Sequence, residues 1–144
     1  MIATILDRYS TPQCARTLGL DILDADAARG WIRIAFQAKP EFCNASGAIQ
    51  GGFLAAMLDD TMGPAVLIMT QAEVHPTTIG MNVNFLSPAT PGLLFGEATV
   101  LHLGKTIGFV EAQLTDDQGR IIARGTSSVR LRPMRVAMKE ACDA

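Results

Sequence analysis

Two adjacent aspartates, Asp59 and Asp60, lie at the centre of residues 51–69, the longest apolar segment of the chain. In a helix, side chains three, four and seven positions apart share a face. The face of Asp59 would then be built largely from small residues: Gly52, Ala55, Ala56 and Gly63. Because an isolated buried charge is too costly to keep, such a carboxylate must be paired or must border a cavity that a ligand fills. Periodicity alone does not decide which of the two aspartates is functional.

A glycine pair, Gly51-Gly52, opens the same segment. The first backbone N–H groups of a helix have no partner within the helix and carry about half a positive charge from the helix dipole, so a ligand oxygen can bind there. The alternative is a tight turn that needs the flexibility of glycine. Asn44 and Gln50, in the preceding loop, are candidates to hold a water or polarise a carbonyl, or to make hydrogen bonds within the turn.

A carboxylate and a free N–H group are sufficient to hydrolyse an activated ester. An aspartate with its ordinary pKa of about 3.9 is ionised at neutral pH and can take a proton from water or attack a carbonyl directly. A positioned base contributes about 10²–10⁴-fold to the rate and one oxyanion donor about 10²–10³-fold, which is enough for a thioester.

Other hydrolytic chemistries are poorly supported. His75 and His102 are too far apart in sequence for a local pair of metal ligands. Ser127 and Ser128 lack the glycine-flanked motif of a serine hydrolase nucleophile. The sequence therefore predicts an enzyme that needs neither a metal nor a cofactor.

A buried helix is predicted to hold these groups, because Ala, Leu and Met dominate residues 51–69. A membrane span is disfavoured, since each aspartate at its centre would cost about 2.5–3.5 kcal/mol. Strands are predicted before and after this helix, at residues 17–23, 31–36, 78–86, 93–103, 107–115 and 121–131. Within residues 78–86, alternation places Ile79, Met81, Val83 and Phe85 on one face and Thr78, Gly80, Asn82 and Asn84 on the other.

The connections between the later strands are short, with turns at Leu103-Gly104-Lys105 and Asp117-Gln118-Gly119. Short turns favour antiparallel pairing and leave no room for crossover helices. Two strands, one long helix and four consecutive strands therefore predict an α+β domain that spans residues 1–144. We expect one sheet curled around the helix, which would bury the helix on nearly all sides.

The composition is that of a globular intracellular protein: 144 residues, 49% hydrophobic and 18% charged. A formal net charge of −2 and the absence of a basic run argue against nucleic acid as a partner. Cys14, Cys43 and Cys142 are odd in number and widely separated, which favours free thiols in a reducing compartment. Residues 1–10 lack the features of a secretory signal, so we expect a cytoplasmic protein.

The segment NASGAIQGGFLAAMLDDTMGPA, residues 44–65, resembles the signature of the PaaI-like branch of hotdog thioesterases. That signature contains an Asn, a short glycine loop, His-Gly-Gly and an Asp nine residues after the His. The segments TTIGMNVNFLSPA, residues 77–89, and LGKTIGFVEAQLTDDQGRIIARGT, residues 103–126, are similar to later strands of the same family. The resemblance implies a hotdog fold, with an antiparallel sheet wrapped around one long helix, and the hydrolysis of an acyl- or aryl-CoA thioester.

The resemblance also implies roles for individual residues. Asp59 would be the general base or the nucleophile, and Gly51 would give its N–H to the thioester oxygen. Asn44 would help to place water, and Thr78 would stand where the family keeps a hydroxyl contributed from the partner subunit. Asp60 stands where the family usually has a small or polar residue, so the resemblance assigns the chemistry to Asp59.

One position departs from the family pattern, because Gln50 stands where the family usually has His. Glutamine can donate a hydrogen bond but does not carry a proton at neutral pH, so whatever that His does by titration is missing. Two alternatives therefore remain: a non-catalytic acyl-CoA binding or sensing hotdog protein, and a hotdog dehydratase, which relies on a His paired with an acid.

The polar face of residues 78–86 would have no function if it only faced solvent, which favours contact with another subunit. The family resemblance also implies active sites at a subunit interface. We therefore expect a homodimer or homotetramer that takes acyl-CoA as its substrate and binds neither nucleic acid nor membrane. Lys105 and Arg130 are expected to meet the phosphate oxygens of CoA, the alternative being ordinary solvated charges. The full set of candidate substrate-binding residues is Gly52, Gly80, Asn82, Lys105, Thr106 and Arg130.

Overall fold

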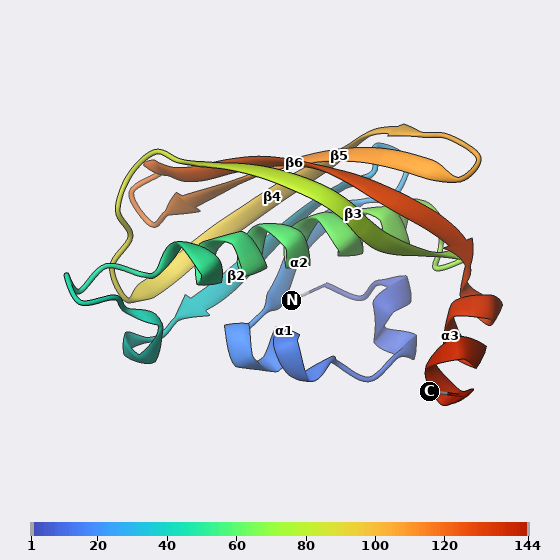
Figure 1. Ribbon diagram of the computed structural model, residues 1–144, viewed down its shortest axis with the longest axis horizontal. Helices are drawn as coiled ribbons and strands as arrows, with labels where there is room; N and C mark the ends of the chain where they lie inside the picture. The colour runs from blue at the N-terminus through green and yellow to red at the C-terminus, as the bar shows by residue number, and fades with distance from the viewer. Residues whose placement is uncertain (1, 144) are drawn as a thin grey trace.

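The computed structural model describes residues 2–143, and of residues 139–142 the backbone only. A six-stranded antiparallel sheet arches over one long helix, α2 (Gly51–Met69), as Figure 1 shows. The strands lie in the order β1 (Asp21–Asp26), β2 (Trp31–Ala38), β4 (Gly92–Leu103), β5 (Ile107–Asp116), β6 (Ile121–Pro133) and β3 (Val74–Phe85). The remaining elements are η1 (Ile5–Arg8), α1 (Gln13–Leu18), η2 (Pro40–Phe42) and α3 (Met134–Asp143). The α+β architecture predicted from the sequence is confirmed.

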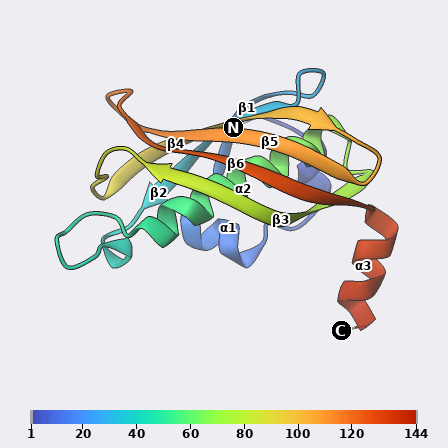
Figure 2. The same ribbon diagram turned by 45° about the horizontal axis from the view of Figure 1, so that its top comes forward.

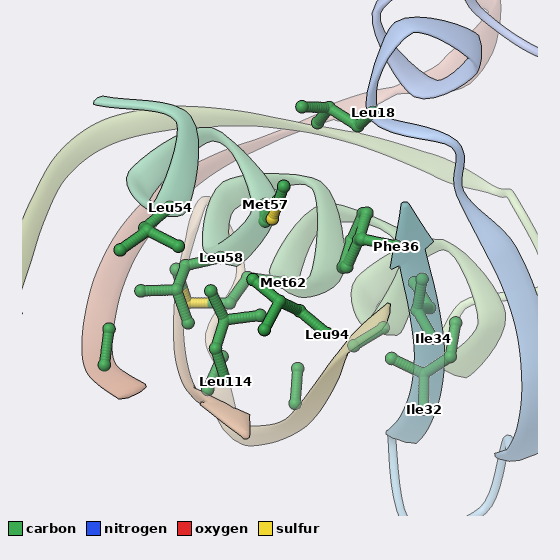
Figure 3. Packing of buried hydrophobic residues seen from close by; sticks show 14 of the residues in the cluster. Leu18, Ile32, Ile34, Phe36, Leu54, Met57, Leu58, Met62, Leu94 and Leu114 are labelled. Atoms are coloured by element: carbon green, nitrogen blue, oxygen red, sulfur yellow. The ribbon is translucent and has the colours of Figure 1, made fainter. Parts of the chain in front are cut away.

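The core lies between α2 and the sheet. The helix packs against all six strands, and its sheet-facing side chains Leu58 and Met62 are at most 1% exposed. Figure 3 shows them gathered with Leu94 and Leu114 between the helix and the strands. Burying one such side chain stabilises the fold by about 1.5–3 kcal/mol, so this cluster fixes the position of the helix. By length and hydropathy α2 could also cross a membrane, the one helix of residues 2–143 for which this holds, but here it is the core helix.

The expectation that α2 would be buried on nearly all sides is wrong. Its face opposite the sheet carries the exposed residues Gly52 and Ala56 and the partly exposed Gly63 and Leu67. One sheet can cover only one side of a helix, and the N-terminal elements η1 and α1, which lie below α2 in Figure 1, cover only part of the other side. A strip of small residues next to Asp59 is therefore open to solvent in the single chain.

One prediction of secondary structure is wrong in part. Residues 17–23 were expected to form a strand, but residues 17 and 18 are the end of the helix α1, Gly19 is its C-cap, and only residues 21–23 belong to a strand, β1. Gly19 has a φ of +65°, the left-handed conformation in which glycine commonly ends a helix. The C-terminal helix α3 was not predicted.

The two predicted hairpin turns are confirmed. Gly104 N–H donates to Ile107 O at 2.8 Å between β4 and β5, and Asp116 N–H donates to Arg120 O at 3.0 Å between β5 and β6. Cys14 and Cys43 are free thiols that form no disulfide bond with any described residue. The side chain of Cys142 is not among those that the structure describes.

Strand β3 forms one edge of the sheet, where it pairs only with β6, as Figure 2 shows. A β-bulge between Thr78 and Gly80 shifts the alternation of its side chains. Thr78 lies opposite the buried Val129 and so faces α2, whereas Ile79 is 61% exposed. The predicted faces of Thr78 and Ile79 are therefore wrong, because a bulge inserts one residue that a strict period of two cannot anticipate.

Candidate active site

The carboxylate of Asp59 is held by the hydroxyl of Thr78. Thr78 Oγ1 donates a hydrogen bond of 2.7 Å to Asp59 Oδ1, and the β3 bulge is what turns this hydroxyl toward α2. Within residues 2–143, Asp59 Oδ2 accepts no hydrogen bond. The threonine belongs to the same chain as Asp59, which corrects the expectation that a partner subunit brings it. One carboxylate oxygen is thus fixed, and the other is available to a water or a thioester carbon.

The start of α2 offers one backbone donor. Gln50 is the N-cap of the helix, and its Oε1 accepts a 2.8 Å hydrogen bond from Gly52 N–H. Gly52 N–H is therefore already used, contrary to the expectation that both glycines would offer free donors. Gly51 N–H has no partner among the described residues. Gln50, which stands where the family usually has His, thus stabilises the N-terminal end of α2 in this chain.

Asn44 makes the turn hydrogen bonds that were its alternative role. Its Oδ1 accepts from Ser46 N–H at 2.9 Å, from Ser46 Oγ at 2.7 Å and from Ala48 N–H at 3.3 Å. The amide group of Asn44 donates no hydrogen bond within the described part of the chain. A donor therefore remains exposed in the loop that leads to Gly51.

Gly51 and Asp59 lie too far apart to act together within one chain. They are eight residues apart on one continuous helix, which corresponds to about 12 Å along the helix axis. A donor that stabilises the oxyanion must lie about 3 Å from the reacting oxygen, and the base must lie equally close to the attacking water. A single chain therefore carries two separated half-sites.

Lys105 and Arg130, which were expected near the CoA phosphates, lie close to the candidate substrate-binding residue Thr106. Arg130 pairs with Thr77 on one side and with Ile107 on the other, and Leu131 N–H donates to Thr106 O at 2.7 Å. Lys105, Thr106 and Arg130 are all exposed at this end of the sheet. They thus form an exposed cationic end of the sheet, and Arg130, which alternates with the buried Val129, points to the face away from α2 and from the Thr78 hydroxyl.

Gly80 and Asn82 lie elsewhere. They are opposite Ser128 and Thr126 on the face of the sheet that points away from α2, where Asn82 lines a polar groove with Glu97 and Arg124. The structure does not bring these two residues beside Asp59 of the same chain, and their substrate-binding role stays a prediction.

Asp60 is in a less favourable environment for a charged carboxylate than Asp59. Its Oδ2 is buried without a hydrogen-bond partner. Burial, and to a smaller extent the charge of Asp59, raises the pKa of the Asp60 carboxyl above its usual value. Asp60 therefore holds its proton to higher pH and is less suited to act as an ionised base.

Replacing Asp60 with asparagine is expected to stabilise the protein at neutral pH. The unfolded chain ionises this carboxyl at its ordinary pKa and the folded chain only above it, so stability is lost as pH rises through this interval. The substitution Asp60→Asn removes the ionisable group and with it the cost of ionising a buried carboxyl at pH 7. Urea unfolding at pH 7 and below pH 4 measures the gain, which should vanish at acid pH. The exposed Asp117→Asn is the control, and an equal effect of both substitutions would contradict the interpretation.

Sequence reasoning missed the contact between Phe85 and Gly51. The ring of Phe85 lies so close to Gly51 that a Cβ atom there would be 3.2 Å from Phe85 Cζ. The only sequence signal was the alternation that placed Phe85 on the face of Met81 and Val83. A contact between residues 34 positions apart depends on how β3 crosses the start of α2, which no local pattern specifies.

The comparisons with known proteins agree on one family. The family model described as Thioesterase superfamily matches residues 46–123, a range that includes Gly51, Asp59 and Thr78. Human acyl-coenzyme A thioesterase 13 is 33% identical over 118 residues, which are 81% of this chain and 83% of that protein. Acyl-coenzyme A thioesterase PaaI of Escherichia coli is 27% identical over 122 residues, which are 83% of this chain and 84% of that protein.

A solved structure gives the same result. The crystal structure of a phenylacetic acid degradation-related protein from Ralstonia eutropha JMP134 matches with a TM-score of 0.82 at 32% identity, and covers 88% of this chain and 95% of that one. The hotdog fold that the resemblance implied is confirmed by this match and by the family model.

Proposed function

The chain belongs to the thioesterase superfamily and is a thioester hydrolase, and we propose that it hydrolyses an acyl-CoA thioester to the free acid and CoA. The observation that carries the catalytic assignment is the hydrogen bond from Thr78 to Asp59, which orients a carboxylate with one free oxygen on a partly exposed helix face. The names of the human and Escherichia coli relatives support CoA as the thiol.

Asp59 acts as general base or as nucleophile. As a base, Asp59 Oδ2 takes a proton from water while the water oxygen attacks the thioester carbon. As a nucleophile, the same oxygen attacks the carbon and forms an anhydride that water then hydrolyses. In both cases the carbonyl oxygen gains negative charge, which Gly51 N–H stabilises, and the C–S bond breaks to release the CoA thiolate.

A second copy of the chain completes the site. The outer edge of β3 is unpaired in the single chain, and Ile79 on this strand is 61% exposed. An exposed edge of this kind is suited to pair with another strand. Two copies of β3 related by a two-fold axis would run antiparallel, so the Phe85 end of one copy, beside its Gly51, would approach Thr78 and Asp59 of the other. The dimer thus joins two half-sites that are about 12 Å apart in each chain.

The cationic end formed by Lys105, Thr106 and Arg130 is the proposed binding site for the CoA phosphates. Removing charge with Lys105→Gln and Arg130→Gln together should raise KM for acyl-CoA by about tenfold or more, as two charge-assisted contacts are lost. KM for an acyl thioester of a simple thiol, which has no phosphate, should change little. Steady-state kinetics with both substrates measures the difference. Equal effects on the two substrates would mean that Lys105 and Arg130 do not bind phosphate.

Release of free thiol from a panel of short, medium and aryl acyl-CoA thioesters tests the proposed function. The wild-type protein should turn over at least one of them, and Asp59→Asn should not. Saturable binding of CoA thioesters without release of thiol from any of them would instead favour a binding or sensing protein.

A further inference from the structure

The ring of Phe85 lies outside the core although it belongs to the inward face of β3. It is 53% exposed, whereas Met81 and Val83 on the same face pack against the core. Three ring carbons, Cζ, Cε1 and Cε2, lie 3.2 to 3.6 Å from the position that a Cβ atom on Gly51 would occupy. The exposed ring therefore bounds the surface next to the one free donor at the start of α2.

This position places the ring beside any carbonyl bound at Gly51. A carbonyl oxygen that accepts from Gly51 N–H lies about 3 Å from the nitrogen. The carbonyl carbon is one bond from this oxygen. The sulfur and the α-carbon of the acyl group are both two bonds from it. A substituent of the carbonyl carbon that lies on the side of the Gly51 Cα then comes within van der Waals reach of the ring.

The α-carbon is the better match for an aromatic wall. The thiol arm of CoA is polar and must lead outward to phosphates, for which the exposed Lys105 and Arg130 are the proposed partners. The acyl arm is apolar and gains from contact with the ring. The ring lies so close to Gly51 that a Cβ atom there would be 3.2 Å away, so a branch on the α-carbon that points to this side would meet the ring.

We propose that Phe85 is a specificity-determining residue, whose ring excludes acyl groups branched at the α-carbon from the carbonyl site at Gly51. The inference rests on the proposed function and deepens it. A misfitting methyl group in a shaped pocket commonly changes kcat/KM by about 10-fold or more, so the effect is measurable.

The test compares butyryl-CoA with isobutyryl-CoA, which have the same atoms but differ in branching at the α-carbon. Phe85→Ala should raise the ratio of kcat/KM for isobutyryl-CoA to that for butyryl-CoA by about tenfold, and Phe85→Leu should raise it less. Phe109→Ala is the matched control, because Phe109 is 46% exposed on the outer face of β5, away from Gly51. It should leave the ratio unchanged.

The possible outcomes are distinct. An unchanged ratio in Phe85→Ala, or an equal loss with both substrates, would overturn the proposal while leaving the hydrolase assignment intact. Dissociation constants for the two thioesters, measured by calorimetry in the Asp59→Asn background with and without Phe85→Ala, give the same ratio without turnover. If the wild type released no thiol, the proposed function would fail, yet a shift of this binding ratio toward the branched thioester would still support the role of Phe85.

Discussion

Replacement of Asp59 by asparagine is expected to lower kcat by about 10²-fold or more with little change in KM, because it removes a base that acts only in the transition state. Asparagine keeps the size of the side chain, and its oxygen can still accept the hydrogen bond from Thr78 Oγ1. The loss would therefore report the missing negative charge and not a rearranged site. Thiol release from acyl-CoA under steady-state conditions measures both constants.

Asp60→Asn is the matched control for this substitution. Asp60 is turned by about 100° around the helix relative to Asp59, so the two carboxylates cannot address the same thioester carbon. Asp60→Asn should retain most of the activity and gain stability. If the Asp59→Asn variant stayed active and the Asp60→Asn variant were inactive, the base would have been assigned to the wrong aspartate.

Replacement of Gly51 by proline is expected to lower kcat by about 10²–10³-fold, the usual effect of losing one oxyanion donor. Gly51 is the first residue of α2, a position that proline tolerates well because its N–H has no partner within the helix. Gln50 has a φ of −64° and a ψ of 137°, an extended conformation that a following proline accepts. The substitution therefore removes the N–H donor while preserving the helix, and like alanine it adds a Cβ atom 3.2 Å from the Phe85 ring.

Gly51→Ala separates the donor from the shape of the site. Alanine keeps the N–H but adds a methyl group 3.2 Å from the Phe85 ring, so a smaller loss is expected from crowding alone. Melting temperatures should show that both variants are folded. If Gly51→Pro and Gly51→Ala lost activity equally, Gly51 N–H would not be the oxyanion donor.

The main helix was predictable residue for residue, because an apolar segment opened by a glycine pair has a distinct beginning. The strand predicted at residues 17–23 began too early because Gly19, the C-cap of α1, was not recognised as a helix stop, and only residues 21–23 lie in β1. The sheet order also could not be derived from short turns alone. Strand β3 pairs with β6, which is three strands later in the sequence. This pairing depends on the packing of all the strands around α2.

For the site, the sequence identified Asp59 because a charge inside an apolar helix demands a physical reason. It could not show that Thr78 faces Asp59, since that depends on a bulge, or that Gln50 caps Gly52. The separation of Gly51 from Asp59 was already present in the spacing of eight residues. The structure shows that α2 is continuous from Gly51 to Met69. Because of this, Gly51 and Asp59 of one chain cannot form one site.

A mixed dimer tests this central claim most directly. One chain would carry Asp59→Asn and the other Gly51→Pro, each with its own affinity tag, so that only dimers with one copy of each are purified. If the site joins Gly51 of one copy to Asp59 of the other, each mixed dimer contains one intact site and one doubly altered site. It should then show about half the activity of the wild-type dimer, although each variant alone is nearly inactive. A mixed dimer as inactive as its parents would contradict a site shared between two chains.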